Sequence, residues 1–130
     1  MKADHILQAI ISIGGGVLSY AMGGYDLLLK TMLALTIIDF VTGTGQAIYH
    51  GKFKAMVCVK GTIRKIYMYL TVALAVIIQH FLGDNIPIRE TVIVFYIIYE
   101  GMSAIENIGK VIPYPAKLRE IFESLNDKYE

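Results

Sequence analysis

Two long stretches without a charged side chain constrain the fold of this chain more than any other feature. Residues 6–25 and residues 66–83 contain no Lys, Arg, Asp or Glu, over 20 and 18 positions respectively. A helix needs about 20 apolar residues, within a range of about 17–25, to cross the ~30 Å hydrocarbon core of a bilayer. Both stretches are long enough, and a soluble domain of 130 residues rarely needs two such helices. The chain is therefore predicted to be an all-α, polytopic transmembrane helical bundle.

The composition agrees with a membrane location. Hydrophobic residues make up 55% of the chain and charged residues 18%, against roughly 45–50% and ~25% in soluble domains. Twelve Lys and Arg against 11 Asp and Glu give a net charge of +1, so there is no basic surplus for general nucleic-acid binding. A single cysteine, Cys58, excludes an intrachain disulfide framework.

Two further segments are apolar but carry charges inside them. Residues 27–48 include Asp39, and residues 91–109 include Glu100. A central charge costs an isolated transmembrane helix about 2.5–3.5 kcal/mol, but a helix in a bundle can turn it toward its neighbours. We therefore predict four spans, with three as the alternative. The single predicted membrane domain, 1–130, has spans at about 6–23, 27–48, 64–83 and 91–109 and a tail at 110–130.

The basic residues predict how the protein is oriented in the membrane. The segment between the second and third spans contains no acidic residue and five basic ones: Lys52, Lys54, Lys60, Arg64 and Lys65. Because cytoplasmic loops carry an excess of Lys and Arg, this segment should be cytoplasmic, and four spans then place both termini in the cytoplasm. The apolar spacing of residues 118–125 predicts a short amphipathic cytoplasmic helix. We expect it to pack on the cytoplasmic end of the bundle or on a neighbouring subunit.

Small residues form a stripe along the first predicted span. Gly15, Ser19 and Gly23 recur every four residues, and Gly16 adds to a parallel row. Such stripes let two helix backbones approach closely. The partner helix can belong to the same bundle or to another copy of the chain, and the sequence leaves both possibilities open.

Polar residues inside the predicted spans are candidates for function. Asp39 and Glu100 each lie about eight residues from the inner end of their span, or ~12 Å at ~1.5 Å per residue. Glu100, Ser103 and Asn107 share one helix face, which Glu106 borders. Ionisable groups at this depth are candidate functional sites, although hydrogen bonding between two helices is an equally good interpretation.

The basic segment supplies possible partners for these acids. Arg64 and Lys65 enter the third span at the boundary where Glu106 lies, so we hypothesise an ion pair between Glu106 and one of them. Lys60 adds to the cytoplasmic basic charge. The three histidines are dispersed, and the sequence contains no catalytic triad, phosphate-binding loop or metal-ligand cluster. We therefore expect no enzymatic activity, no cofactor and no bound metal, which leaves a pore-former, a channel subunit or an accessory subunit.

Four short motifs, in this order along the chain, are similar to those of one family. Residues 100–107 read EGMSAIEN, similar to E-G-x-S-x-x-E-N, and residues 61–66 read GTIRKI, like the basic start of that family's third span. Residues 39–43, DFVTG, fit an Asp-x-x-x-Gly pattern, and residues 112–115, IPYP, fit the Pro-containing segment after the last span. From about residue 29 to residue 118, the chain resembles the phage holin family that includes the clostridial toxin-release holins.

The resemblance implies a function and a set of partners. Holins accumulate in the bacterial cytoplasmic membrane and assemble into lesions, through which an endolysin or a toxin leaves the cytoplasm. The implied partners are further copies of the chain and the lipid bilayer, with a functional link to an endolysin or toxin that needs no direct contact. Nucleic acid is not an implied partner. The candidates for a water-lined lesion rim are Asp39, Glu100, Ser103, Glu106 and Asn107. A small ion or solute channel, or an accessory subunit of a membrane complex, is the alternative.

Overall fold

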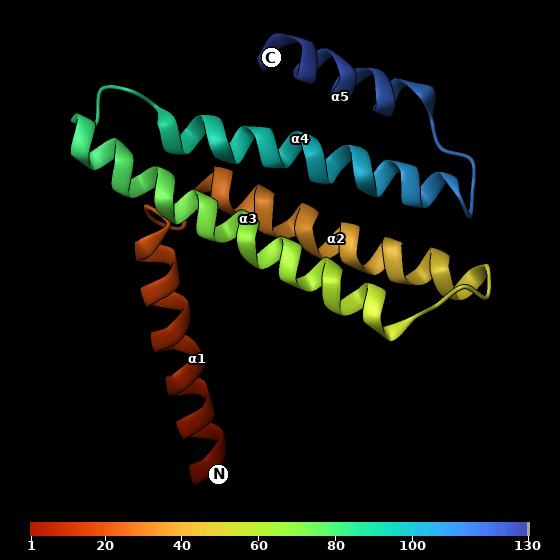
Figure 1. Cartoon of the computed structure of the whole chain (residues 1–130). Coiled ribbons are helices and arrows are strands. Elements are labelled where there is room, and N and C mark those ends of the chain that lie inside the picture. The colour runs from red at the N-terminus through yellow and green to blue at the C-terminus, as the bar shows by residue number, and fades with distance from the viewer. Residues whose placement is uncertain (130) are drawn as a thin grey trace.

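The computed structural model describes residues 1–129 and is helical throughout, apart from short connections (Figure 1). The helices of this range are α1 (Lys2–Ala21), α2 (Leu27–Tyr49), α3 (Ala55–Leu82), α4 (Ile88–Gly109) and α5 (Ala116–Tyr129). No strand occurs among these residues. The prediction of an all-α chain with an additional C-terminal helix is confirmed.

Three of the described helices are long and apolar enough to cross a membrane. They are α2, α3 and α4, with 23, 28 and 22 residues, or ~33–42 Å at ~1.5 Å per residue. Many of their large apolar side chains point outward: Ile37 is 55% exposed, Ile77 66% and Phe95 58%. Water would oppose such a surface, whereas lipid accepts it, so the fold is that of a polytopic helical membrane protein.

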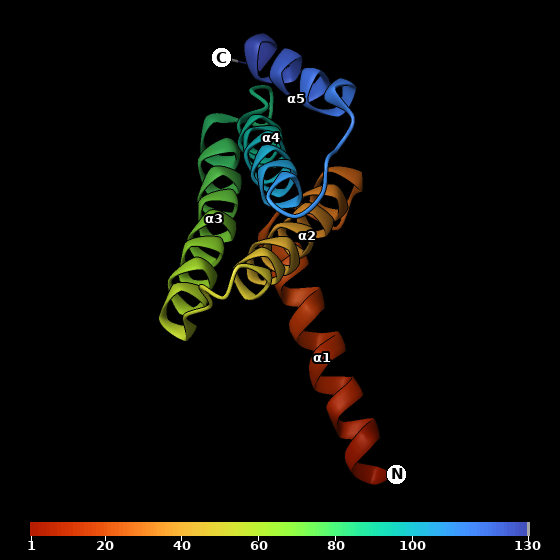
Figure 2. The same ribbon diagram turned by 90° about the vertical axis from the view of Figure 1, so that its right-hand side faces the viewer.

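The bundle is organised around α4. This helix contacts both α2 and α3, and those two contact each other less. The first turns of α3 diverge from α4 (Figures 1 and 2). A small apolar core joins the three helices through Met32 of α2, Met68 and Val72 of α3, and Ile93 of α4. Three of these side chains have no exposed surface and Met68 has little. The core therefore fixes the register of α2 and α3 on α4.

The connections between helices gather at the two ends of the bundle. At one end, His50 Nε2 lies 2.9 Å from the backbone oxygen of Lys110, which joins the α2–α3 loop to the linker before α5. At the other end, Arg89 at the start of α4 hydrogen-bonds to the α1–α2 turn. The predicted cytoplasmic and outer connections thus lie at opposite ends; which end faces the cytoplasm stays a prediction.

Helix α1 does not join the bundle, and here the structure differs from a four-helix arrangement. It leaves the α1–α2 turn and runs away from α2, α3 and α4 (Figures 1 and 2). All its side chains but Ser19 are exposed, and a Cβ added to Gly15 or Gly16 would meet no atom within 4 Å. Of the two possibilities that the sequence leaves open for the small-residue stripe, the structure does not show packing of Gly15 or Gly16 inside the bundle, and contact with another copy stays a proposal. The bundle matches the three-span alternative, and a membrane crossing by α1 stays a prediction.

Helix α5 folds back along α4 (Figure 1). Its Phe122 ring packs over Gly101, where no side chain stands in the way. The expectation that this helix packs on the end of the bundle is wrong, because the vacant position at Gly101 lets an aromatic ring settle on the side of α4. Helix α3 also departs from its predicted boundary: it begins at Ala55, so part of the basic segment is helical.

Candidate functional site

A buried cluster of charges joins the three bundle helices. The Lys65 ammonium of α3 lies 2.6 Å from Asp39 Oδ2 of α2 and 2.5 Å from Glu100 Oε2 of α4. The Lys65 and Asp39 side chains are 14% and 12% exposed, and that of Glu100 only 1%. Each helix thus contributes one charge, and we call these three residues the charge triad.

Asn107 extends the charge triad toward the nearby end of the bundle. Its Nδ2 donates to Asp39 Oδ1 at 3.0 Å and approaches Thr42 Oγ1 at 3.4 Å. Gly43 of α2 lets this amide come close, since a Cβ at that position would lie 3.3 Å from Asn107 Nδ2. The amide therefore donates to the Asp39 oxygen that Lys65 does not contact, and this hydrogen bond links α4 to α2.

A second polar contact lies one helical turn farther along the bundle. The Tyr69 hydroxyl of α3 donates to Thr36 Oγ1 of α2 at 3.0 Å, and Thr36 donates in turn to its own helix at the Met32 carbonyl oxygen. Beyond it begins the apolar core around Met32. The polar interior therefore extends from Asn107 to Tyr69 and then stops.

The electrostatics of the charge triad make it costly to disturb. Two carboxylates and one ammonium carry a net charge of −1 when all three are ionised. Removing one partner of a buried ion pair leaves an uncompensated charge and costs about 3–5 kcal/mol. Water around the same groups would solvate the net charge and remove the cost of burying it. The triad is thus suited to two situations: a closed interior in which its partners meet, and a wet surface on which they can separate.

The structure brings together some of the residues proposed from the sequence and separates others. Asp39, Glu100 and Asn107 converge, and Ser103 borders the same region. Glu106 is exposed and lines a cavity between α4 and α5, away from Lys65. The hypothesised ion pair of Glu106 with Arg64 or Lys65 is therefore wrong: within residues 1–129 no ion pair involves Glu106, and Lys65 lies too deep to serve it.

Two of the basic candidates, Lys60 and Arg64, do not take part in the triad. Both are exposed on the first turns of α3, and Arg64 lines a cleft beside the triad. Gly23 is a turn residue and not part of a helix contact: its φ is +87°, and a Cβ there would lie 2.5 Å from Arg89 Nε. The roles of the remaining candidates as lesion-lining or association residues stay proposals.

The structure also reveals an interaction that sequence reasoning missed. Arg89 is 5% exposed. Its Nη1 donates to Asp26 Oδ2 at 2.8 Å, its Nε to the Met22 carbonyl oxygen at 2.6 Å and its Nη2 to that of Gly24 at 3.0 Å. The hydrogen bond from Arg89 is the main reason that the pKa of Asp26 falls to about 2. Arg89 lies between the predicted spans at 64–83 and 91–109, and no pattern in the sequence there predicts a buried side chain.

Three apolar spans around a buried charge triad define a polytopic helical membrane protein. Residues 16–127 match the bacteriophage holin family, and the chain belongs to that family. The family is non-enzymatic. The sequence resemblance to phage holins is therefore confirmed.

Individual relatives agree with this assignment. A probable holin of Bacillus phage phi105 is 31% identical over 104 residues, covering 77% of each chain. An uncharacterized protein of Listeria innocua is 30% identical over 92% of this chain and 86% of its own length. An uncharacterized protein of Clostridium perfringens is 27% identical over 96% of both chains. No solved structure is significantly similar.

Proposed function

We propose that this protein is a holin in the working sense: copies assemble in the bacterial cytoplasmic membrane into lesions that release an endolysin or a toxin. The observation that carries the proposal is the charge triad, Lys65 with Asp39 and Glu100, enclosed among three apolar spans. Family membership and the similarity to the probable holin of a Bacillus phage support it.

The triad fits a protein that must exist in two states. In a single copy the Lys65 ammonium pairs with both carboxylates and holds them inside the bundle, so the outer surface stays apolar and inserts in lipid. In a lesion many helices line water, and charged side chains are then favourable on the wet side. A protein with both states shifts between them when one is stabilised, here by assembly of further copies. In this proposal Asp39, Glu100, Ser103, Glu106 and Asn107 contribute to the wetted rim.

Helix α1 is the proposed means of self-association. A Cβ added to its Gly15 or Gly16 would meet no atom within 4 Å, so this part of the helix surface is available to another copy. Small residues let helix backbones approach closely in a membrane, where packing rather than the hydrophobic effect holds helices together. When two copies first associate through α1, the α2–α4 bundle and its charge triad stay intact.

Co-expression with a cytoplasmic cell-wall-degrading enzyme tests the proposal. The enzyme must lack an export signal, so that it lyses the cell only if the membrane opens to a folded protein. We expect growth to continue while the protein accumulates and then to stop abruptly with lysis; a catalytically inactive enzyme should give the growth stop without lysis. Cells that hold the protein in the membrane yet keep growing with the enzyme inside would overturn the proposal.

The same experiment separates the alternative functions. A small ion or solute channel would disturb growth through loss of solutes, but the enzyme would stay in the cytoplasm and the cells would not lyse. An accessory subunit would leave growth unchanged and would co-purify with a fixed partner. Lysis that requires the active enzyme is therefore specific to a protein-sized lesion.

A further inference from the structure

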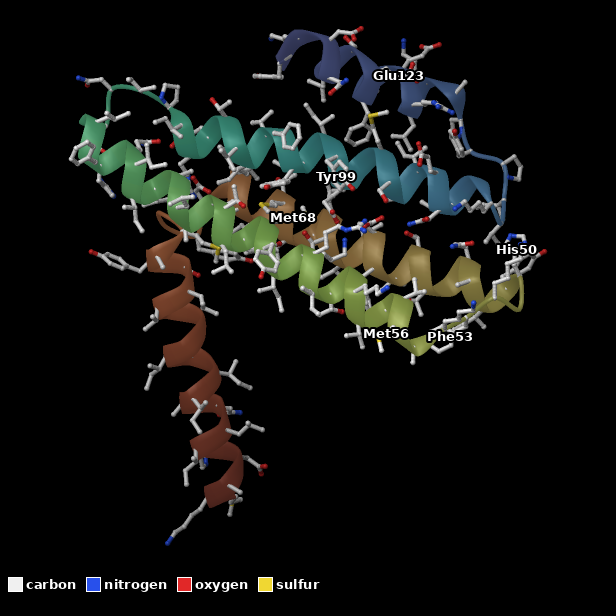
Figure 3. The ribbon with its side chains drawn as sticks, in the orientation of Figure 1. His50, Phe53, Met56, Met68, Tyr99 and Glu123 are labelled. Atoms are coloured by element: carbon white, nitrogen blue, oxygen red, sulfur yellow. The ribbon has the colours of Figure 1, made fainter. Side chains whose placement is uncertain are left out.

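A cleft opens beside the charge triad between α2 and α3. Its volume is about 290 Å³, and its walls come from the second half of α2, the α2–α3 loop and the first turns of α3. Asp39 and Lys65 of the charge triad are among the residues that line it, together with Ser103 and Asn107 of α4. Figure 3 shows His50 and Phe53 at the α2–α3 loop, the end of the bundle where the cleft lies.

The rim of this cleft is basic. Lys52 and Lys54 of the loop and Arg64 of α3 all line it, and all three side chains are exposed. Among residues 1–129 none of the three has an acidic partner within ion-pair distance. The one acidic residue in the cleft, Asp39, is already held by Lys65 and Asn107. The rim therefore carries three uncompensated positive charges.

Part of the remaining lining is apolar. Phe40, Phe53 and Val57 line the same cleft and are 40%, 47% and 63% exposed. A cleft for a free anion or an acidic peptide has no need of this wall. Aromatic and aliphatic side chains below a basic rim match a molecule with a charged head and a hydrocarbon chain.

The length of α3 is consistent with a position of the cleft at the level of the lipid headgroups. Helix α3 has 28 residues, or ~42 Å, which exceeds the ~30 Å hydrocarbon core by ~12 Å, or about eight residues. If its apolar C-terminal part spans the core, the excess falls on the basic start of the helix, and Arg64 reaches the boundary. Lys52 and Lys54 then lie outside the hydrocarbon core, and Phe40 lies within it.

We propose that this cleft is a binding site for one anionic phospholipid. Lys52, Lys54 and Arg64 contact the phosphate headgroup, and an acyl chain lies against Phe40, Phe53 and Val57. Basic pockets between transmembrane helices bind such headgroups in other membrane proteins. The proposal needs no lesion, so it stands or falls separately from the proposed function.

Native mass spectrometry of the detergent-purified full chain tests the site. The probes are phosphatidylglycerol and phosphatidylcholine with identical acyl chains, so that only the headgroup differs. We expect phosphatidylglycerol to bind more tightly. We expect that binding to weaken about fivefold in each of three variants: Lys52→Gln, Lys54→Gln and Arg64→Gln. This factor corresponds to the usual attraction of ~1 kcal/mol between one juxtamembrane basic residue and anionic lipid. Phosphatidylcholine binding should not change.

Lys60→Gln is the matched control. Lys60 has the same charge and lies one turn from Arg64 on α3, but it does not line the cleft. Equal loss of phosphatidylglycerol binding in Lys60→Gln and Arg64→Gln would show a diffuse attraction to the basic segment and overturn the proposal. All four positions are exposed, so these variants should fold normally, which their thermal unfolding checks.

Two further arms separate the lipid from other phosphate sources. Excess inorganic phosphate should not displace phosphatidylglycerol, because it cannot occupy the apolar wall. Phe53→Ser should weaken the lipid complex while leaving the basic rim in place. If inorganic phosphate competes fully, or if Phe53→Ser has no effect, the cleft binds a free anion and the lipid proposal is wrong.

Discussion

The ring of Phe122 on α5 lies over Gly101 of α4, and any side chain at position 101 would collide with that ring. Gly101 follows Glu100, whose carboxylate meets Lys65 in the interior. One turn of α4 therefore holds the tail helix on one side and the charge triad on another. The position of α5 and the packing of the bundle are linked through this turn.

The first prediction concerns this contact. Phe122→Ala removes the ring that docks α5 and should weaken docking by on the order of 1 kcal/mol, since the ring is only half-buried. Hydrogen exchange of the α5 amides should then be faster, while the amides of α2–α4 keep their protection. Ile121→Ala is the control, because that neighbour is 48% exposed. Equal exchange rates in wild type and Phe122→Ala would contradict the observed packing.

The second prediction concerns the charge triad. Lys65→Met leaves Asp39 and Glu100 buried without their cation and should destabilise the bundle by about 3–5 kcal/mol. Thermal unfolding in detergent measures this loss. The triple variant with Asp39→Asn and Glu100→Gln removes the charges together and should recover much of the stability. A Lys65→Met protein as stable as wild type would mean that the triad does not form, and Lys60→Met controls for loss of an exposed positive charge.

The third prediction concerns Asp26 and pH. Its pKa is lowered from an ordinary value of 3.8 to about 2 by Arg89. The stabilisation is thus fully present above about pH 4 and is lost as the pH falls through about 2. Asp26 is 48% exposed, so solvent screening limits the effect to about 1 kcal/mol. Asp26→Asn keeps the helix cap, and it should unfold at a lower temperature than wild type at pH 7.

The pH series contains its own control. Because protonated Asp26 resembles asparagine, the difference in unfolding temperature between wild type and Asp26→Asn should shrink as the pH approaches about 2. A constant difference across this range would show that the ion pair with Arg89 contributes nothing to stability.

The fourth prediction concerns self-association through α1. Gly15→Leu places a large side chain on the proposed contact stripe and should reduce cross-linked oligomers in membranes several-fold, because the backbones can no longer approach. Gly14→Leu is the matched control, since it makes the same change one position away from the stripe, and neither site contacts the bundle. If both variants cross-link like wild type, association does not use this stripe.

Several features of the fold follow from simple patterns. The charge-free stretch at residues 66–83 lies in α3 except for its last residue, the C-cap Gly83. Counting residues from the ends of the predicted spans placed Asp39 and Glu100 at similar depth. The structure places both carboxylates on one ammonium. Two acids buried at one depth can be accommodated by protonation, by water or by a basic partner, and depth alone does not choose among the three.

The choice of that partner could not be predicted in the same way. Lys65 and Arg64 are neighbours, and only the rotation of α3 about its axis decides which of them points inward. The burial of Arg89 depends on the positions of two backbone carbonyl groups and the Asp26 carboxylate, all in a turn far away in sequence. The docking of α5 depended on a single missing side chain at Gly101. Each of these depends on tertiary geometry that periodicity does not contain.

The most direct measurement of the central claim is release from liposomes that enclose both a small dye and a folded fluorescent protein. Purified chain is added at increasing protein-to-lipid ratio, and both signals are followed together. Formation of protein-sized lesions predicts that the fluorescent protein escapes along with the dye above a threshold ratio. Release of the dye alone at every ratio, with the fluorescent protein retained, would contradict the account.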